Sequence, residues 1–393
     1  MKIAYYLLGY LIYPFSFLFP RSKRIWVFGS FRGSFNDNAK YLFIYASENK
    51  PDITSIWLSQ NKNTVSLVRQ LGLKSYSIFS LKGIFYSLRA KYWFYNSYTS
   101  DILFFTSGGS TCINLWHGVG LKKIEFSIKS GALSDIYVKK TFKQRFFYPQ
   151  VFRRPDYFLS STEFQSIKFA EAFRINVSKC LNLGYPRNEL LIETESERMQ
   201  FVERYEPVET KEIIEKIKSF NKAFIYMPTW RDSQKDLFSQ TFDLQYLNEI
   251  MFDKKSLLIL KPHANTTIDS RKLSMYSNIM VINNKVDIYT ILPYTNVLIT
   301  DYSSVLYDYI LMKEKDIILY LYDYNEYINA RDFNYPFHEN VVGKCVSNFS
   351  ELVQCIKDED YRIDEAKRLE IKNRFWGNQA NNICEEIISR VTL

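Results

Sequence analysis

Short apolar runs alternate with amphipathic stretches along most of the chain. The apolar runs have the length and composition of buried strands. They occupy 24–30, 53–59, 91–96, 113–118 and 156–161 in the first half of the chain, and 223–230, 256–263, 279–283, 297–302 and 316–323 in the second. Between them lie stretches with apolar residues at helical spacing, at 38–48, 64–71, 163–173, 246–251, 287–292 and 305–312. This alternation predicts the α/β class, with parallel sheets covered by helices.

The chain is long enough for two domains. Its 393 residues exceed the length of roughly 250 at which a single hydrophobic core stops growing. Residues 193–218 are rich in Glu and Lys and lack a long apolar run, so the domain boundary is predicted there. The expected parts are an amino-terminal segment, 1–23, a first domain, 24–205, and a second domain, 206–393, with a cleft between the domains. The last predicted helix, 378–390, could cross back to the first domain.

Residues 3–20 are mostly apolar and include four tyrosines. A basic cluster follows directly: Arg21, Lys23 and Arg24. No small-residue cleavage pattern follows the apolar run, which disfavours a signal peptide. The short length, Gly9, Pro14 and the tyrosines disfavour a helix that spans the bilayer. The pattern favours a helix that lies in the membrane surface with a basic flank, and a buried core helix is the alternative.

The net charge of +9 is concentrated in one segment. Residues 121–154 contain nine Lys and Arg side chains against two acidic ones, interleaved with aromatic residues. Such a field favours an anionic partner: lipid headgroups, a polyphosphate polymer or nucleic acid. A solvated basic face without a partner is the alternative. The basic residues expected to make these contacts are Lys122, Lys123, Lys139, Lys140, Lys143 and Arg145.

Several common enzyme classes lack their sequence signals here. The chain has no GxxxxGK[ST] loop, no GxGxxG after the first strand, no HExxH and no GxSxG. The five cysteines are scattered, without a CxxC pair, which indicates reduced structural thiols rather than zinc ligands or disulfides. No cluster of carboxylates marks a metal site. We therefore predict no obligate cofactor and leave a divalent-cation requirement open.

Polar side chains follow four of the predicted strands. In open parallel α/β sheets, ligands bind beyond the carboxyl ends of the strands, so these side chains are expected at one cleft. They are His117; Thr229 and Arg231; Lys261 and His263; and Asp301, Ser303 and Ser304. Histidine can remove a proton from an attacking hydroxyl or stabilise a leaving phosphate, although a single histidine is more often structural. The third histidine, His338, lies in a less regular segment and is assigned no role.

The segment 297–310, VLITDYSSVLYDYI, has the form of a strand, a polar turn and a helix. If a helix begins near Ser303, its first N–H groups and the serine hydroxyls can bind a pyrophosphate, and Asp301 would orient the turn. An ordinary N-cap by Asp301 or Ser303 is the alternative. Arg231 offers a planar fork for phosphate oxygens, with Lys261 in a secondary role, but Arg231 could equally pair with Asp232 on the surface.

Five motifs occur in order along the chain. They are NLWHGVGLKKI (114–124), LGYPRNELL (183–191), YMPTWRD (226–232), LKPHAN (260–265) and LITDYSSVLYDYILMKEKDIILYLYDYNEY (298–327). Over roughly residues 24–337 their order and spacing resemble those of the CDP-glycerol glycerophosphotransferases of teichoic-acid and capsule polymer synthesis. Any one of these motifs is a weak signal, whereas all five in this order are a strong one.

The resemblance implies a GT-B-like arrangement, in which two Rossmann-like domains with parallel sheets face each other across a cleft. It implies transfer of glycerol phosphate, or a related alditol phosphate, from CDP-glycerol or CDP-ribitol to a hydroxyl of a lipid-linked or polymeric anionic acceptor, with release of CMP. The reaction would take place at the cytoplasmic face of the cell membrane, with the protein bound peripherally to the membrane surface. On this resemblance nucleic acid is not an expected partner.

The resemblance also implies roles for individual residues. His117, in the WHG motif, would be the base at the acceptor side, and His263, in the KPH motif, would contact the donor phosphates and help CMP leave. Four residues would line the pyrophosphate: Thr229, Arg231, Ser303 and Ser304. Asp301 and Lys261 would support them.

Two other functions are compatible with the residues. A GT-B glycosyltransferase that uses a nucleotide sugar for a surface polysaccharide would have the same fold and could also use a histidine base. A basic adaptor for membranes or nucleic acid would explain the charged segment and the amino-terminal helix. The adaptor would not explain two histidines and a Ser-Ser turn at predicted strand ends.

Overall fold

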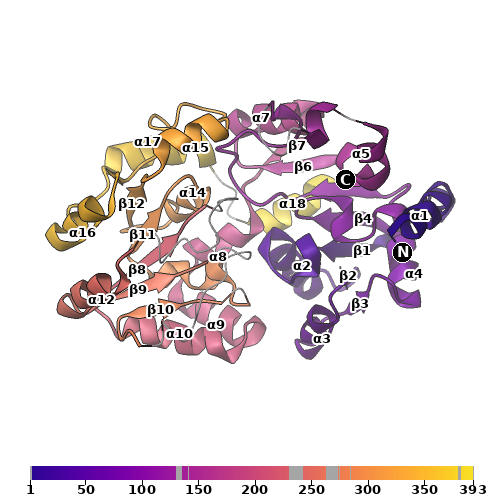
Figure 1. Cartoon of the computed structure of the whole chain (residues 1–393). Helices are drawn as coiled ribbons and strands as arrows, with labels where there is room; N and C mark the ends of the chain where they lie inside the picture. The colour runs from indigo at the N-terminus through magenta and orange to yellow at the C-terminus, as the bar shows by residue number, and fades with distance from the viewer. Residues whose placement is uncertain are drawn as a thin grey trace. The chain divides into compact units, whose positions relative to one another are not determined.

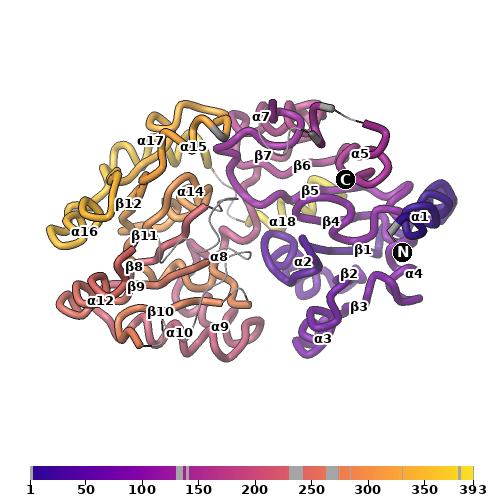
Figure 2. Tube along the Cα trace, in the orientation of Figure 1, coloured from indigo at the N-terminus to yellow at the C-terminus, as the bar shows by residue number. Residues whose placement is uncertain are grey.

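The computed structural model describes residues 2–129, 135–139, 141–229, 242–262, 273, 275–283, 285–378 and 382–392. The chain forms two compact units, residues 1–189 together with 375–393, and residues 190–374. Figure 1 labels their helices and strands, and Figure 2 traces the chain through them. Each unit contains one parallel sheet with helices, so the predicted α/β fold class with two Rossmann-like domains is confirmed.

The predicted domain boundaries differ from these units at two places. Residues 190–205 were expected in the first domain but belong to the second unit, and 375–393 were expected in the second but belong to the first. The Glu- and Lys-rich stretch in which the domain boundary was predicted forms two helices, α9 (Glu195–Tyr205) and α10 (Val208–Lys218). Val202, Ile214 and Ile217 are buried there. Charge on the outer faces of these helices concealed their apolar faces.

The sheet of the first unit has seven parallel strands in the described chain, in the order β3-β2-β1-β4-β5-β6-β7. The strands are β1 (Ser22–Gly29), β2 (Thr54–Ser59), β3 (Ser75–Ser77), β4 (Ala90–Tyr95), β5 (Thr111–Asn114), β6 (Tyr157–Ser160) and β7 (Cys180–Asn182). The α-helices of this unit are α1 (Lys2–Ser16), α2 (Asp37–Asn49), α3 (Lys62–Gln70), α4 (Leu81–Arg89), α5 (Phe142–Phe147), α6 (Pro149–Phe152), α7 (Glu163–Phe173) and α18 (Ile383–Thr392). The strand order reverses between β1 and β4, and this is where open α/β sheets bind ligands.

The sheet of the second unit has six parallel strands in the described chain, in the order β10-β9-β8-β11-β12-β13. The strands are β8 (Lys222–Met227), β9 (Ser256–Leu260), β10 (Ile279–Val281), β11 (Val297–Thr300), β12 (Asp316–Tyr320) and β13 (Lys344–Val346). Its further helices are α8 (Glu189–Ile192), which begins at the unit boundary, α12 (Leu244–Asp253), α14 (Val305–Tyr309), α15 (Tyr324–Ala330), α16 (Phe349–Asp358) and α17 (Glu365–Trp376). The helix predicted at 287–292 is instead a pair of 3-10 turns, Ile288–Thr290 and Leu292–Tyr294. The strand order reverses between β8 and β11.

Every predicted strand is present, and three short strands were missed. The missed strands are β3, β7 and β13, each three residues long and each at an edge of its sheet. An edge strand buries less side-chain surface than a central one, so it needs no continuous apolar run and leaves little signal in the sequence. Several predicted strands also extended too far at their carboxyl ends, where the polar turns begin.

The last helix, α18, packs on α2 within the first unit (Figure 2). Glu385 of α18 pairs with Lys50 at 2.7 Å and accepts a hydrogen bond from Tyr45 at 2.9 Å. The prediction that the last helix returns to the first domain is therefore confirmed.

The amino-terminal helix α1 packs on the first unit through one face only. The ring of Tyr13 stacks on Phe104 with a centroid distance of 4.9 Å, and a Cβ at Gly9 would lie 2.3 Å from the Phe105 ring, so glycine is required there. The other face is open, since Leu7, Leu8, Leu11 and Phe15 are 54, 59, 66 and 62 percent exposed. The segment is thus neither buried on all sides nor detached from the fold. Among the described residues, no helix is long and apolar enough to cross a membrane.

Arg21 fixes the end of this helix to the core. Its guanidinium donates hydrogen bonds to five backbone carbonyl oxygens: those of Ser16, Ser87, Ala90, Thr106 and Gly108. Ser87 lies in the last turn of α4, Ala90 begins β4, and Thr106 and Gly108 lie in the segment that follows β4, so one side chain joins several parts of the first unit. The basic residue expected to flank a membrane helix therefore has a structural role.

Candidate functional site

His117 lies just beyond β5, at the carboxyl edge of the first sheet. The strand ends at Asn114, earlier than expected, and the Asn114 side-chain oxygen accepts the Trp116 N–H at 2.9 Å. Trp116 and Gly118 have φ angles of +52° and +125°, so the chain turns sharply on both sides of the histidine. The imidazole lies against the Trp116 ring, with 4.0 Å between centroids. This turn presents an exposed imidazole beside a buried tryptophan.

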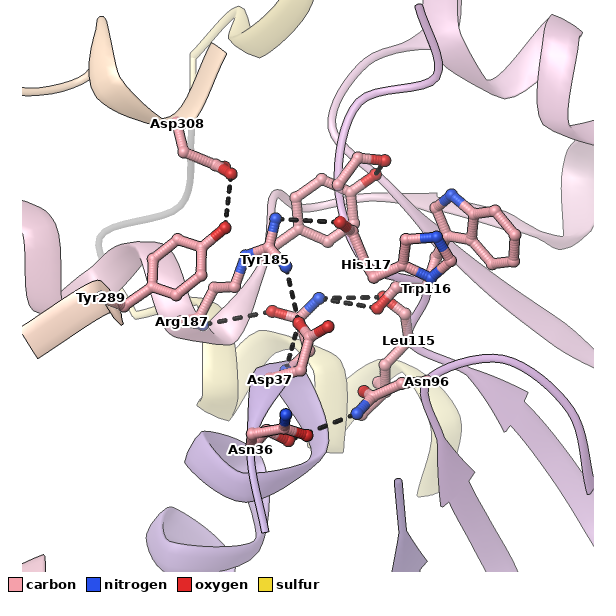
Figure 3. A network of polar contacts seen from close by, with 12 residues as sticks. Asn36, Asp37, Asn96, Leu115, Trp116, His117, Tyr185, Arg187, Tyr289 and Asp308 are labelled. Atoms are coloured by element: carbon pink, nitrogen blue, oxygen red, sulfur yellow. Dashed lines mark hydrogen bonds and ion pairs between the residues drawn. The ribbon is translucent and has the colours of Figure 1, made fainter. Parts of the chain in front are cut away.

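Arg187 holds the turn that carries His117 (Figure 3). Its Nη1 pairs with the Asp37 carboxylate at 2.6 Å, and its Nη2 donates to the His117 backbone oxygen at 3.0 Å. The Arg187 side chain is only 4 percent exposed, so this ion pair is shielded from water on the arginine side. Tyr185 adds a hydrogen bond from its hydroxyl to the Gly118 oxygen at 3.1 Å. The WHG turn is therefore fixed by the segment that follows β7.

Asparagine side chains extend this network to the first strands. Asn38 Nδ2 donates to the backbone oxygen of Trp116 at 2.9 Å, and Asn96 Oδ1 accepts the Ala39 N–H at 3.0 Å. Asn96 Nδ2 also donates to the Ser30 hydroxyl at 2.8 Å, across the point where the strand order reverses. These amides tie the ends of β1, β4 and β5 together around α2.

The protonation of His117 is biased toward the neutral form. Although the imidazole is exposed, surrounding protein atoms reduce its hydration and lower the pKa of His117 below its ordinary value. The Asp37 carboxylate raises the pKa of His117, and the Arg187 guanidinium lowers it by a smaller amount. A neutral imidazole with a free path to solvent can accept a proton near neutral pH.

Asp301 organises the carboxyl edge of the second sheet. Both oxygens of its carboxylate accept the Thr229 N–H, at 2.9 and 3.1 Å, and Oδ1 also accepts the Tyr302 N–H at 2.6 Å. Thr229 follows β8 and Asp301 follows β11. This interaction therefore connects the two loops on either side of the reversal in strand order. Asp301 thus contacts the backbone of both loops, and its role in orienting a phosphate-binding turn stays a prediction.

Ser303 and Ser304 follow Asp301 and are both half-buried. Helix α14 begins at Val305 with Ser304 at its N-cap position. The Ser304 side chain makes no capping hydrogen bond, and the Ser303 hydroxyl accepts the Val305 N–H at 3.5 Å. The predicted helix at 305–312 is shorter than expected, because α14 ends at Tyr309. A helix of one turn has little macrodipole, so an anion at this turn would depend on backbone amides and serine hydroxyls.

Tyr302 anchors the same turn from below. Its ring stacks on Tyr327 with 3.9 Å between centroids and an interplanar angle of 10°, and its hydroxyl donates to Asp323 at 3.1 Å. Asp308, in α14, accepts a hydrogen bond from the Tyr289 hydroxyl at 2.7 Å, which Figure 3 also draws. The turn that carries the two serines is thus packed rigidly against the sheet.

Lys261 follows β9, the strand beside β8. Partial burial lowers the pKa of Lys261 to about 8, and the Asp287 carboxylate opposes this shift. Thr229, Lys261 and the 301–304 turn therefore follow three adjacent strands at one edge of the second sheet.

Three of the predicted site residues lie outside the described residues: Arg231, His263 and Lys140. The side chain of Lys139 also lies outside them. Of the remaining basic residues, Lys122 and Lys123 are half-buried, while Lys143 and Arg145 are exposed on α5. Within the described part of the chain, no group of three or more His, Cys, Asp or Glu side chains is placed to hold a metal ion.

Sequence reasoning missed the residues that position His117. Asp37, Asn96 and Arg187 received no role, since each looks like an ordinary surface residue in a linear sequence. The one signal for Arg187 was its place in LGYPRNELL, a motif of the resembling family.

The fold and the two strand-end sites define a GT-B-like α/β protein with Rossmann-like units. The chain belongs to the CDP-glycerol:poly(glycerophosphate) glycerophosphotransferase family, which it matches over residues 11–393. The similar proteins below agree with this membership.

The chain is similar to two curated bacterial proteins. One is the teichoic acid glycerol-phosphate transferase of Staphylococcus aureus, 30 percent identical over 250 residues, or 62 percent of this chain and 60 percent of that protein. The other is the teichoic acid poly(glycerol phosphate) polymerase of Bacillus spizizenii, 28 percent identical over 260 residues, or 63 percent of this chain and 61 percent of that protein. The matched region thus spans about three fifths of each relative.

The fold is similar to that of the wall teichoic acid polymerase TagF. The match to one TagF structure covers 99 percent of this chain and 92 percent of the TagF chain, at a TM-score of 0.78 and 23 percent identity. A variant of TagF with CDPG covers 95 percent of this chain with 89 percent of its own, at a TM-score of 0.75 and 24 percent identity. At this identity the similarity establishes the fold.

Proposed function

We propose that this protein transfers glycerol phosphate, or a related alditol phosphate, from a CDP-activated donor to an acceptor hydroxyl in the synthesis of a teichoic-acid-like polymer. The observation that carries the proposal is the position of the WHG and TDYSS motifs: each follows a central strand, one at the carboxyl edge of each parallel sheet. Family membership supports the same reaction, and so do the names of the similar proteins and the CDPG of one TagF structure.

The donor is assigned to the second unit. Its pyrophosphate would bind at the reversal between β8 and β11, where the Thr229 backbone, Ser303 and Ser304 offer hydrogen-bond donors and Asp301 holds the two loops together. Lys261 would add a positive charge from the neighbouring strand. Arg231 and His263 remain proposed phosphate contacts from the same loops.

The acceptor is assigned to the first unit, with His117 as the base. The acceptor hydroxyl loses its proton to the neutral imidazole while its oxygen forms a bond to the β-phosphorus of the donor. The bond between that phosphorus and the bridging oxygen breaks, and CMP leaves with the electron pair. The contribution of the protein is positioning and neutralisation of charge, as in other phosphoryl transfers.

We further propose that the protein works at the cytoplasmic membrane surface with a lipid-linked or polymeric acceptor. The exposed leucines of α1 and the exposed basic residues of α5 support this location. The two helices contact each other, since the Tyr10 hydroxyl donates to the Phe146 oxygen at 2.9 Å and Tyr6 packs on Phe147 with 5.3 Å between centroids. An apolar face beside basic residues is typical of peripheral membrane binding.

A donor screen tests the reaction. The purified full chain is incubated with an acceptor-containing membrane fraction and with CDP-glycerol, CDP-ribitol or a panel of UDP- and GDP-sugars, and nucleotide release is measured. We expect CMP release from one CDP-alditol, loss of that release in His117→Ala, and retained binding of the donor by the variant. Release of UDP or GDP from a sugar donor, without CMP release, would replace the proposal with a glycosyltransferase.

A further inference from the structure

The first unit contains a pocket that the reaction as proposed does not use. Its volume is about 330 Å³, at the lower end of the range for small-molecule sites. Four of its six lining segments directly follow β1, β2, β3 and β4, at the carboxyl edge of the sheet and beside the reversal between β1 and β4, and α1 and residues 149–150 of α6 complete the lining. This is the position at which open α/β sheets bind ligands.

Helix α1 forms one wall of this pocket. Tyr5 and Tyr6 line it, and both pack on Phe105, with centroid distances of 5.6 and 6.0 Å. Leu7 and Leu8, next along the same helix, are 54 and 59 percent exposed. The pocket therefore opens beside the apolar face of α1, so an apolar chain that lies along this face could enter it.

The remaining walls contain aromatic, aliphatic and polar side chains, with a single cation. Phe31 and Phe79 are 55 and 60 percent exposed, which is unusual for such large apolar side chains beside a cavity. Arg32 is the one Lys or Arg among the lining residues, all of which the structure describes, and Gln60 adds an amide. The lining thus combines aromatic side chains with a comparable amount of polar surface, in which Arg32 can bind one anionic group.

The backbone presents Arg32 in an uncommon conformation. Its φ is +55°, in the left-handed region that non-glycine residues rarely adopt. The turn is held by hydrogen bonds from Gly33 N to the Ser30 oxygen at 2.9 Å and from the Ser59 hydroxyl to the Gly33 oxygen at 2.6 Å. Such strain persists only where the surroundings fix it, and it is concentrated at ligand sites.

The one acidic residue of the lining is directed toward the backbone. The Asp101 carboxylate accepts the Ser97 N–H at 2.8 Å, and the side chain is buried. Ser97 follows Asn96, which belongs to the hydrogen-bond network around the His117 turn. The pocket and the His117 site are thus two parts of one strand edge, separated by the loop after β4.

We propose that this pocket binds the phosphate-bearing, lipid-proximal part of the acceptor, that is, a phosphate ester of an apolar alcohol. The proposal rests on the proposed function and specifies how the acceptor is held. Arg32 would bind the phosphate, the aromatic walls would cover the first part of the apolar chain, and α1 would lead the rest of the chain toward the bilayer. A CDP group is a poor fit, because its two phosphates would meet only one cation.

The binding test uses dodecyl phosphate below its critical micelle concentration, measured by calorimetry on the full chain. We expect saturable binding, and binding about tenfold weaker in Arg32→Gln and in Phe79→Ala. The matched controls are Arg24→Gln, at the opposite end of β1, and Phe252→Ala, an equally exposed phenylalanine of the second unit, and both are expected to bind like the wild type. Equal affinity of Arg32→Gln and Arg24→Gln would overturn the proposal.

Two further measurements distinguish binding of dodecyl phosphate from binding of phosphate alone, of the alcohol alone and of a lipid bilayer. Inorganic phosphate and dodecanol should each bind at least about tenfold more weakly than dodecyl phosphate, because each lacks half of the chemistry. The fractions of the Arg32→Gln and Arg24→Gln proteins that sediment with phosphatidylglycerol vesicles should be equal. If only the Arg32 variant loses vesicle binding while its affinity for dodecyl phosphate is unchanged, the side chain binds bulk lipid and the proposal is wrong.

Kinetics then connect the pocket to the transfer. Arg32→Gln should raise the KM for the lipid-linked acceptor about tenfold and leave the KM for the CDP-alditol unchanged. A wild-type protein that binds dodecyl phosphate but releases no CMP from any CDP-alditol would refute the proposed function while the pocket stands. Normal CMP release with an unchanged acceptor KM in Arg32→Gln would refute the pocket while the function stands.

Discussion

Arg187 and Asp37 lie 150 positions apart in the sequence and form an ion pair of 2.6 Å beside His117. The second terminal nitrogen of the same guanidinium holds the His117 backbone oxygen. One side chain therefore sets both the position of the proposed base and the charge around it, and these two effects can be separated by substitution.

Arg187→Met should impair transfer in two distinguishable ways. Loss of the contact to the His117 oxygen loosens the turn, so kcat should fall about 10- to 100-fold while the affinity for the donor is unchanged. Loss of the cation also removes a charge that lowers the pKa of His117, while Asp37 continues to raise it. A base must be neutral to act, so the acid limb of the pH profile of kcat/KM should move to higher pH.

The matched control is Arg187→Lys, which keeps the charge but cannot make both contacts. It should lose kcat like the methionine variant and keep the acid limb near its wild-type position. An acid limb that moves to lower pH in Arg187→Met would contradict the electrostatic assignment.

Asp301→Ala should weaken both the second unit and its donor site. The substitution removes the carboxylate that accepts the half-buried N–H of Thr229 and the buried N–H of Tyr302, at a cost of about 2–3 kcal/mol. We expect a lower thermal midpoint and weaker binding of CDP-glycerol in calorimetry. Asp301→Asn, which keeps one acceptor oxygen, should be intermediate in both. Ser303→Ala should keep the thermal midpoint and lose only donor affinity, so equal stability losses in the Asp301 and Ser303 variants would argue against this division of roles.

Placing charge on the exposed face of α1 should release the protein from membranes. Leu7→Glu with Leu11→Glu changes side chains that are 54 and 66 percent exposed, so the fold should be unaffected. The fraction of protein that sediments with vesicles should fall several-fold, because placing a hydrated carboxylate in the membrane interface costs free energy. The control pair is Val208→Glu with Phe252→Glu, which are 77 and 65 percent exposed on the second unit. Equal sedimentation of both pairs would remove α1 as the contact.

Asp101→Asn should change how stability depends on pH. Burial raises the pKa of Asp101 to about 7, against hydrogen bonds from the backbone of Ser97 and its neighbours that lower it. The folded state therefore binds this proton more tightly than the unfolded state, and the carboxyl group lowers stability as pH rises from about 4 to about 7. Asparagine removes this penalty, which is at most about 4 kcal/mol. The thermal midpoint of the variant minus that of the wild type should thus increase between pH 5 and pH 8, and a flat difference would contradict the assignment.

The sequence predicted the central strands and the sites that follow them for the same reason. A central parallel strand is buried on both faces, so β8, β9 and β11 are continuous apolar runs, and each ends where a polar turn begins. His117, Thr229, Lys261 and Asp301 were therefore predictable as strand-end residues.

Residues that act through contacts distant in the chain were not predictable in this way. The Arg187–Asp37 ion pair forms because the fold brings the segment after β7 close to α2, and neither local sequence predicts this contact. The pocket beside Arg32 is assembled from six separate segments, and a single exposed phenylalanine such as Phe79 looks like any surface residue. The two helices within 193–218 were not predicted because the charge on one face of an amphipathic helix resembles the composition of a segment between domains.

The five backbone carbonyls bound by Arg21 have a consequence for how the first unit would meet a bilayer. A helix on a flexible linker leaves the orientation of the attached domain free. Helix α1, in contrast, is joined to the core by the hydrogen bonds of Arg21, and moving it away from the core would break them. Any surface that engages α1 thus fixes the tilt of the whole sheet and the height of His117 above the lipid. The distance from the bilayer surface at which the proposed acceptor hydroxyl can meet His117 is then set by the fold.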